Sequence, residues 1–250
     1  MRAIFIERVT KTRRTGFLKG AKMTNASRTF LPAAGKDWLL PFYDPMVKLL
    51  GGDAARRPLA KQAGLRAGQR ILEVGCGTGT LTLMIKRLQP GVAAVGLDPD
   101  PKAQSRARAK AARTGAEVRF DQGFGDELPY PDESFDRVFS SFMFHHLPAA
   151  EKGKFLEAVR RVLKPDGSLH MLDFEESGGL HSLLAHLFHA HHRLEDNAKD
   201  RVLLLMNDAG LAGEKVAGRR MVFGRVAYYR AVKGSAVISE GRSDGKTAVG

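Results

Sequence analysis

The stretch ILEVGCGTGTLT, residues 71–82, decides the fold of this 250-residue chain. It begins with an apolar run typical of a buried strand and continues with glycines at every second position, Gly75, Gly77 and Gly79. Glycine has no Cβ, so its backbone adopts positive φ easily and its N–H and C=O groups can approach a ligand closely. A helix is predicted to begin near Thr80, and its N-terminal dipole would favour a carboxylate or phosphate at the same point. The glycines alone leave open a tight turn without a ligand.

Strand-like and helix-like segments alternate along the rest of the chain. Strands are predicted at 70–74, 93–97, 117–120, 137–141 and 168–174, and amphipathic helices at 81–88, 101–114 and 151–163. This βαβαβ order predicts an α/β fold with a parallel sheet, helices on both faces and right-handed crossovers. Ligands of such sheets bind beyond the carboxyl ends of the strands, which is where the glycine loop is predicted to lie.

A carboxylate ends the second predicted strand. Asp98 closes the run AAVGLD and follows Gly77 by 21 residues, the separation at which nucleotide-binding α/β folds place an acid against ribose hydroxyls. Nicotinamide dinucleotides and S-adenosylmethionine both carry such a diol, so these two features do not choose between them. The dinucleotide fingerprint is G-x-G-x-x-G, whereas the spacing here is Gly75-x-Gly77-x-Gly79. The glycine spacing therefore favours S-adenosylmethionine.

Four motifs in order resemble those of the class I S-adenosylmethionine-dependent methyltransferases. They are LEVGCGTG (72–79), VGLDPDP (95–101), LPYPDESFDRVFSSFMFHHL (128–147) and RRVLKPDGSLHMLDF (160–174). The resemblance covers residues 36–232 and is strongest to the small-molecule enzymes of ubiquinone and menaquinone biosynthesis. It implies a Rossmann-like, seven-stranded mixed sheet, mostly parallel with an antiparallel seventh strand, with helices on both faces and a small helical lid. Residues 214–233 are expected to supply the last two strands.

The resemblance also implies how the chain would hold S-adenosylmethionine. Glu73 and the glycine loop would hold the methionyl part, Asp98 would accept both ribose hydroxyls, and Pro99 would cover one face of adenine. Phe124 replaces the acid that often meets the adenine amino group, so either it packs on the ring or Asp126 or a backbone carbonyl makes that contact. The expected cofactor-binding residues are Glu73, Gly75, Cys76, Gly77, Gly79, Asp98, Pro99, Phe124, Gly125, Ser140 and Ser141.

Methyl transfer from a sulfonium requires alignment of nucleophile, methyl and sulfur in a dry site, and a general base only if the acceptor must lose a proton. His146 and His145, after the fourth predicted strand, are candidate bases, with helix capping or space filling as the alternative. Tyr43 is the third catalytic candidate, from the aromatic segment 36–50. That segment and residues 175–200 are predicted to form a lid over a partly apolar acceptor. No metal is expected, because no acidic or thiol ligand lies in register with the histidines of the second lid segment.

The formal net charge of +13 raises an RNA or other nucleic-acid methyltransferase as the alternative function. Much of this charge lies in residues 1–22, which are predicted to be a disordered basic leader, whereas residues 23–233 are expected to form one domain and residues 234–250 a flexible tail. Ser140-Ser141-Phe142-Met143 stands where amino-group methylases of bases carry Asn/Asp-Pro-Pro-Tyr, which disfavours that alternative. A non-catalytic or dinucleotide-binding protein is the third reading.

The composition bounds the cellular setting. Cys76 is the single cysteine, which excludes an internal disulfide framework and fits a reducing compartment. No run of about 18 apolar residues is found, so a membrane span is not expected. These features predict a cytoplasmic enzyme acting on a small-molecule acceptor, and they leave its oligomeric state open.

Overall fold

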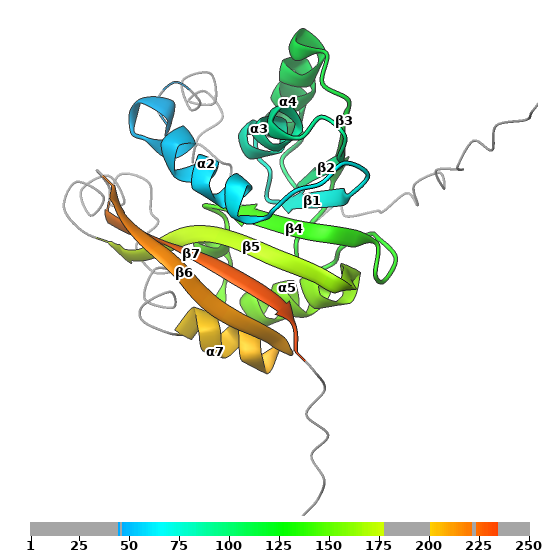
Figure 1. The fold of residues 1–250 in the computed structure, drawn as a ribbon. Coiled ribbons are helices and arrows are strands. Elements are labelled where there is room, and N and C mark those ends of the chain that lie inside the picture. The colour runs from blue at the N-terminus through cyan, green and yellow to red at the C-terminus, as the bar shows by residue number, and fades with distance from the viewer. Residues whose placement is uncertain (1–44, 46, 178–200, 222–223, 235–250) are drawn as a thin grey trace, which may run out of the picture.

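The computed structural model describes residues 45, 47–177, 201–221 and 224–234 (Figure 1). Its helices and strands, in chain order, are α2 (Gly52–Gln62), β1 (Arg70–Val74), α3 (Thr80–Leu88), β2 (Ala93–Asp98), α4 (Pro101–Thr114), β3 (Val118–Gln122), β4 (Phe135–Ser141), the 3-10 helix η2 (Phe144–His146), α5 (Ala149–Val162), β5 (Leu163–Ser177), α7 (Arg201–Asp208), β6 (Leu211–Met221) and β7 (Gly224–Lys233). The strands form one seven-stranded sheet in the order β3-β2-β1-β4-β5-β7-β6. Strands β1 to β5 pair in parallel, and β7 is antiparallel to both neighbours. The predicted seven-stranded mixed sheet with an antiparallel seventh strand is confirmed.

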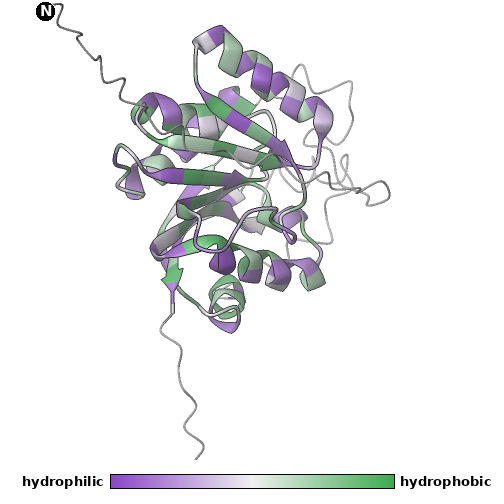
Figure 2. Cartoon of the chain, turned by 90° about the vertical axis from the view of Figure 1, so that its right-hand side faces the viewer, coloured by the Kyte–Doolittle hydropathy of each residue, from purple (hydrophilic) through white to green (hydrophobic). Residues whose placement is uncertain are grey.

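Helices cover both faces of the sheet. In Figure 1, α2, α3 and α4 lie on one side, and α5 and α7 lie on the other. Side chains of a strand alternate between faces, so Ile71 joins the core under α2 and α3, whereas Leu72 and Val74 join the core under α5 and α7. Each helix in Figure 2 carries both hydrophilic and hydrophobic residues, as expected for a helix with one face on the sheet.

The observed elements follow the predicted ones closely in the first half of the chain. Strand β1 and helix α4 have the predicted bounds, whereas β5 begins at Leu163 rather than Ser168. The pairing of β4 with β5 steps from Phe135–Leu163 to Arg137–Ser168, so residues 164–167, Lys-Pro-Asp-Gly, lie in a register shift inside the strand. The extra residues of β5 form an irregularity between two paired stretches, and the strand continues on both sides of it.

Helix α2 was not predicted from the sequence. Its buried positions include Gly52, Ala55 and Ala60, and the charged Arg56 is buried among them. Small and charged buried residues leave only a weak apolar period, and Pro58 lies inside the helix. The helix is therefore stabilised by its packing against α3 and β5, which lie elsewhere in the sequence and are not apparent from its own residue pattern.

Parts of the predicted lid cannot be compared with the structure. Residues 36–44, with Tyr43, and residues 178–200 lie outside the described residues, as do residues 1–22 and 235–250. Within the described ranges, no helix combines the length and the apolar character that crossing a bilayer requires.

Candidate functional site

The glycine loop follows β1 at the carboxyl edge of the sheet. Gly75, Gly77 and Gly79 have φ of 71°, 51° and 73°, the left-handed region predicted for them. The N–H groups of Gly75 and Cys76 both donate to the carbonyl of Leu97 at 2.8 and 3.0 Å, which fixes the loop to the end of β2. The loop then enters α3, with Gly79 as the residue before its first turn.

Asp98, at the end of β2, is held by the loop opposite it. Its carboxylate accepts the N–H of Gly77 at 2.7 Å on Oδ2 and the N–H of Asp100 at 2.9 Å on Oδ1. The side chain is 9% exposed, and burial raises its pKa to about 6 despite these two hydrogen bonds. Each carboxylate oxygen keeps a second lone pair for a ligand hydroxyl.

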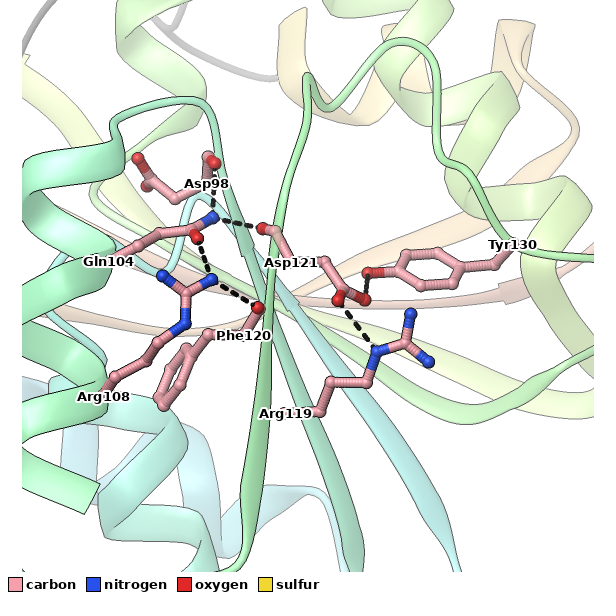
Figure 3. A network of polar contacts seen from close by, with 7 residues as sticks. All are labelled: Asp98, Gln104, Arg108, Arg119, Phe120, Asp121 and Tyr130. Atoms are coloured by element: carbon pink, nitrogen blue, oxygen red, sulfur yellow. Dashed lines mark hydrogen bonds and ion pairs between the residues drawn. The ribbon is translucent and has the colours of Figure 1, made fainter. Parts of the chain in front are cut away.

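A polar network behind Asp98 ties the ends of β2 and β3 to α4 (Figure 3). The amide nitrogen of Gln104 donates to the carbonyl of Asp98 at 2.7 Å and also to the carbonyl of Asp121. Arg108 donates to Gln104 Oε1 at 2.7 Å and to the carbonyl of Phe120 at 2.8 Å. Lys110 donates to the hydroxyls of Thr78 and Thr80. Two basic residues of α4, Arg108 and Lys110, are thus engaged within the fold.

A second buried carboxylate, Glu73, lies at the end of β1. It is 1% exposed and accepts hydrogen bonds from the hydroxyl of Thr82 and, at 3.4 Å, from that of Ser141. Ser141 in turn accepts from Nε of Arg56 at 3.3 Å. Burial raises the pKa of Glu73 to about 7, and the nearby positive charge of Arg56 partly opposes the rise. A chain of polar groups therefore runs from α2 across the sheet edge to α3.

These groups surround a main cavity of about 370 Å³. Predicted residues that line it are Glu73, Gly75, Cys76, Gly77, Asp98, Pro99, Phe124, Gly125, Ser141 and His146. Gly79 and Ser140 are not among the lining residues. A Cβ at Gly79 would lie 2.9 Å from both Ala107 and Phe120, so this glycine serves the packing of α3 on α4. Ser140 is fully buried, and among the described residues its hydroxyl has no hydrogen-bond partner.

A second cavity of about 150 Å³ adjoins the main one, because Arg56, Phe142 and His146 line both. Its other walls come from separate parts of the chain: Val47, Leu50, Gly52, His145, Phe174 and Met221. Phe142 has a φ of 55°, a strained backbone for a bulky residue, and its ring lies 5.2 Å from that of Phe174. Strain of this kind concentrates at functional sites.

His145 belongs to the second cavity rather than the main one. Its Nδ1 lies 2.6 Å from Oδ1 of Asp173, and its backbone N–H donates to Oδ2 of the same carboxylate at 3.2 Å. Asp173 ends the core of β5 and is fully buried. The ring of Phe174 meets the imidazole edge to face at 5.2 Å.

Two residues of this edge were missed by sequence reasoning. Arg56 lies in the unpredicted helix α2, where a basic residue reads as ordinary helix surface. Asp173 was visible only as the acid that follows the apolar run of the fifth predicted strand. The same signal, an acid at a strand's carboxyl end, singled out Asp98 and applies equally to Asp173.

A family model described as a methyltransferase domain matches residues 71–167. The chain is 40% identical over 139 residues to the demethylmenaquinone methyltransferase of Thermus thermophilus, an alignment that covers 54% of this chain and 62% of that protein. It is 35% identical over 140 residues to the ubiquinone/menaquinone biosynthesis C-methyltransferase UbiE of a Marinomonas species, covering 54% of this chain and 55% of the relative. The chain therefore spans less than two thirds of the length of these curated relatives.

Solved structures share the fold. The YcgJ protein of Bacillus subtilis superposes with a TM-score of 0.63 at 20% identity, covering 73% of this chain and 99% of that one. At this level of identity the likeness concerns the architecture alone.

Proposed function

We propose, on the premise that residues 71–167 form a class I S-adenosylmethionine-dependent methyltransferase domain, that this protein transfers the methyl group of S-adenosylmethionine to a small, partly apolar acceptor. The names of the curated relatives given above place them in quinone biosynthesis. Because quinones carry an apolar ring, these names support an acceptor with an apolar part. The cavities at the carboxyl edge of the sheet are where such a reaction would take place.

The residues of the main cavity fit the cofactor group by group. Asp98 offers carboxylate oxygens to the ribose hydroxyls, and Glu73 together with the loop carbonyls offers negative charge to the methionyl ammonium. Arg56 and the N-terminus of α3 offer positive charge to the methionyl carboxylate. Pro99 and Phe124 supply apolar surface for adenine. A volume of about 370 Å³ lies in the range of cofactor sites.

The chemical task left to the protein is positional. When bound, S-adenosylmethionine supplies an electrophilic methyl group on a positively charged sulfur. The loop and the two carboxylates would fix the orientation of the methyl group, and the ring of Phe142 supplies apolar surface where the two cavities adjoin. Direct alignment of an acceptor atom with the methyl group then favours an in-line displacement.

The observation that carries the proposal is that Glu73 and Asp98, two buried carboxylates, share one cavity with a positive-φ glycine loop. Titration calorimetry with S-adenosylhomocysteine tests it. A parallel titration with NADH tests the alternative that the protein binds a dinucleotide. We expect a dissociation constant of about 1 μM, near −8 kcal/mol, for the first and no binding for the second. Binding of NADH instead, or of neither ligand, would refute the proposal.

Replacement of Arg56 by Met is expected to weaken S-adenosylhomocysteine about 10- to 100-fold, because charge-assisted hydrogen bonds contribute about 1.5–3 kcal/mol. 5′-Methylthioadenosine lacks the amino-acid part of the ligand, so its affinity should not change. Arg57→Met, on the exposed side of the same helix, is the matched control and should bind both ligands normally. Equal weakening of both ligands by Arg56→Met would show that Arg56 does not meet the methionyl carboxylate.

The raised pKa values predict a pH dependence with a defined sign. Asp98 and Glu73 hold protons up to about pH 6 and about pH 7 in the fold, whereas the unfolded chain releases them at lower pH. The folded state therefore binds more protons in this window, and the free energy of unfolding should fall as pH rises from about 4 to 7. The ligand favours the ionised carboxylates, so its affinity should rise over the same upper range. Calorimetry in buffers of different ionisation enthalpy should detect proton release on binding, and proton uptake would contradict the assignment.

A further inference from the structure

The second cavity has the size and walls of a site for a flat ring. Its volume of about 150 Å³ equals that of a cavity in another protein that binds benzene. Val47, Leu50 and Met221 give it aliphatic surface, and the rings of Phe142 and Phe174 lie 5.2 Å apart along its wall. It shares Arg56, Phe142 and His146 with the main cavity, so a ring placed here would lie beside the methionyl end of that cavity.

The polar groups of this cavity are few and basic. Apart from His145, the charged or titratable side chains that line it among the described residues are Arg56 and His146. The guanidinium carbon of Arg56 lies 5.2 Å from the centroid of the Phe142 ring, which keeps its charge at the junction of the cavities. A positive charge in a mostly apolar cavity favours an acceptor that becomes negative.

Asp173 determines the proton position on His145. The 2.6 Å contact between Nδ1 and Oδ1 of Asp173 requires a proton between them, because a carboxylate only accepts hydrogen bonds. The proton of the neutral imidazole is thus on Nδ1, and Nε2 carries the free lone pair. Within the described part of the chain, Nε2 has no hydrogen-bond partner. Asp173 would also stabilise the imidazolium that forms when Nε2 takes up a proton.

We propose that the second cavity is the acceptor site, that it takes a ring-borne acidic hydroxyl, and that His145 is its general base with Asp173 as positioning residue. The proposal rests on the proposed methyl transfer and names its acceptor chemistry. The O–H bond of the acceptor breaks and its proton goes to Nε2 of His145. The acceptor oxygen then forms a bond to the methyl carbon as the methyl–sulfur bond breaks, and the sulfur keeps that electron pair. Charge and atoms balance without a further reactant.

The test uses 4-nitrophenol, whose ionised form absorbs at longer wavelength, with the full chain and saturating S-adenosylhomocysteine. The wild type is expected to bind the probe as the phenolate at a pH where the free probe is largely protonated. His145→Gln and Asp173→Asn should each lower the ionised fraction of bound probe about tenfold, a change of about 1.4 kcal/mol. The control His170→Gln replaces another buried histidine, which lines neither cavity, and it should keep the wild-type spectrum.

Calorimetry of S-adenosylhomocysteine on each variant separates the possible failures. Unchanged affinity shows that His145→Gln and Asp173→Asn are folded, so a lost phenolate signal then supports the proposal. A wild type that binds S-adenosylhomocysteine but does not ionise the probe would overturn it, as would a phenolate signal that survives in His145→Gln or that is lost equally in His170→Gln. If the wild type fails to bind S-adenosylhomocysteine, the proposed function itself fails. For a variant that does not fold, the pH profile of methyl transfer in His145→Asn provides the second measurement, and an unchanged acidic limb would refute the role of the base.

Discussion

Gly75→Ala is expected to lower the melting temperature by about 10 °C and to weaken S-adenosylhomocysteine about 100-fold. A Cβ at this position would lie 2.2 Å from Cγ and 2.8 Å from Cβ of Met143, atoms too close to the backbone to swing away. The φ of 71° adds about 1–2 kcal/mol for any residue with a side chain, and the overlap adds about 1–3 kcal/mol. Relief requires the loop to move, which would break the alignment of the Gly77 N–H with Asp98.

Gly64→Ala is the matched control for this prediction. Gly64 also has a positive φ, 56°, but a Cβ there would meet nothing within 4 Å. Only the backbone term should remain, so the melting temperature should fall by about 2–6 °C with no loss of ligand affinity. Scanning calorimetry and ligand titration compare the two variants directly. Equal effects in both would mean that the contact with Met143 does not constrain the loop.

Asp98→Ala is expected to weaken S-adenosylhomocysteine about 10- to 100-fold, because hydrogen bonds to a charged group contribute about 1.5–3 kcal/mol. The carboxylate also holds the N–H groups of Gly77 and Asp100, so its removal deletes the contact of Gly77 with the end of β2, while the bonds from Gly75 and Cys76 to the Leu97 carbonyl remain. 5′-Methylthioadenosine retains the ribose hydroxyls and should lose affinity to the same extent. This pattern is the opposite of that expected for Arg56→Met, which makes the two variants diagnostic of the two ends of the site.

Asp121→Asn is the control for the loss of an acid at this edge of the sheet. Asp121 follows the core of β3 and bonds Tyr130 at 3.0 Å and Arg119 at 2.8 Å, and it does not line the main cavity. Ligand affinity should therefore be unchanged in this variant. An Asp98→Ala protein with wild-type affinity would remove Asp98 from the ribose contact.

Elements with strong local signals were predictable from the sequence. Strand β1 is an apolar run that ends at Gly75, and helix α4 is bounded by Asp100-Pro101 at its start and Gly115 at its end, so even their bounds agree with the prediction. Several positions that line the main cavity were also predictable, because Gly75, Gly77 and Asp98 lie at the ends of strands and parallel strands end at one edge of a sheet.

Positions whose role depends on contacts between distant segments were not predictable. Arg56 is separated from its partner Ser141 by 85 residues, and Asp173 is separated from His145 by 28. His145 and His146 could not be distinguished in the sequence. The position of η2 beside the end of β5, and not the sequence alone, brings His145 into contact with Asp173. Similarly, the difference between Ser140 and Ser141 is decided by which face of the strand end adjoins a cavity.

The sequence by itself determined the alternation of strands and helices from β1 to β5, the positive-φ loop and the acid that closes the second strand, because each of these follows from local backbone preference and spacing. Only the tertiary structure decided that α2 brings a buried guanidinium to the sheet edge, that a second cavity adjoins the first, and that Asp173 orients His145. Burial, pKa and proton position depend on what surrounds a group in space, and those neighbours come from parts of the chain that local patterns do not connect.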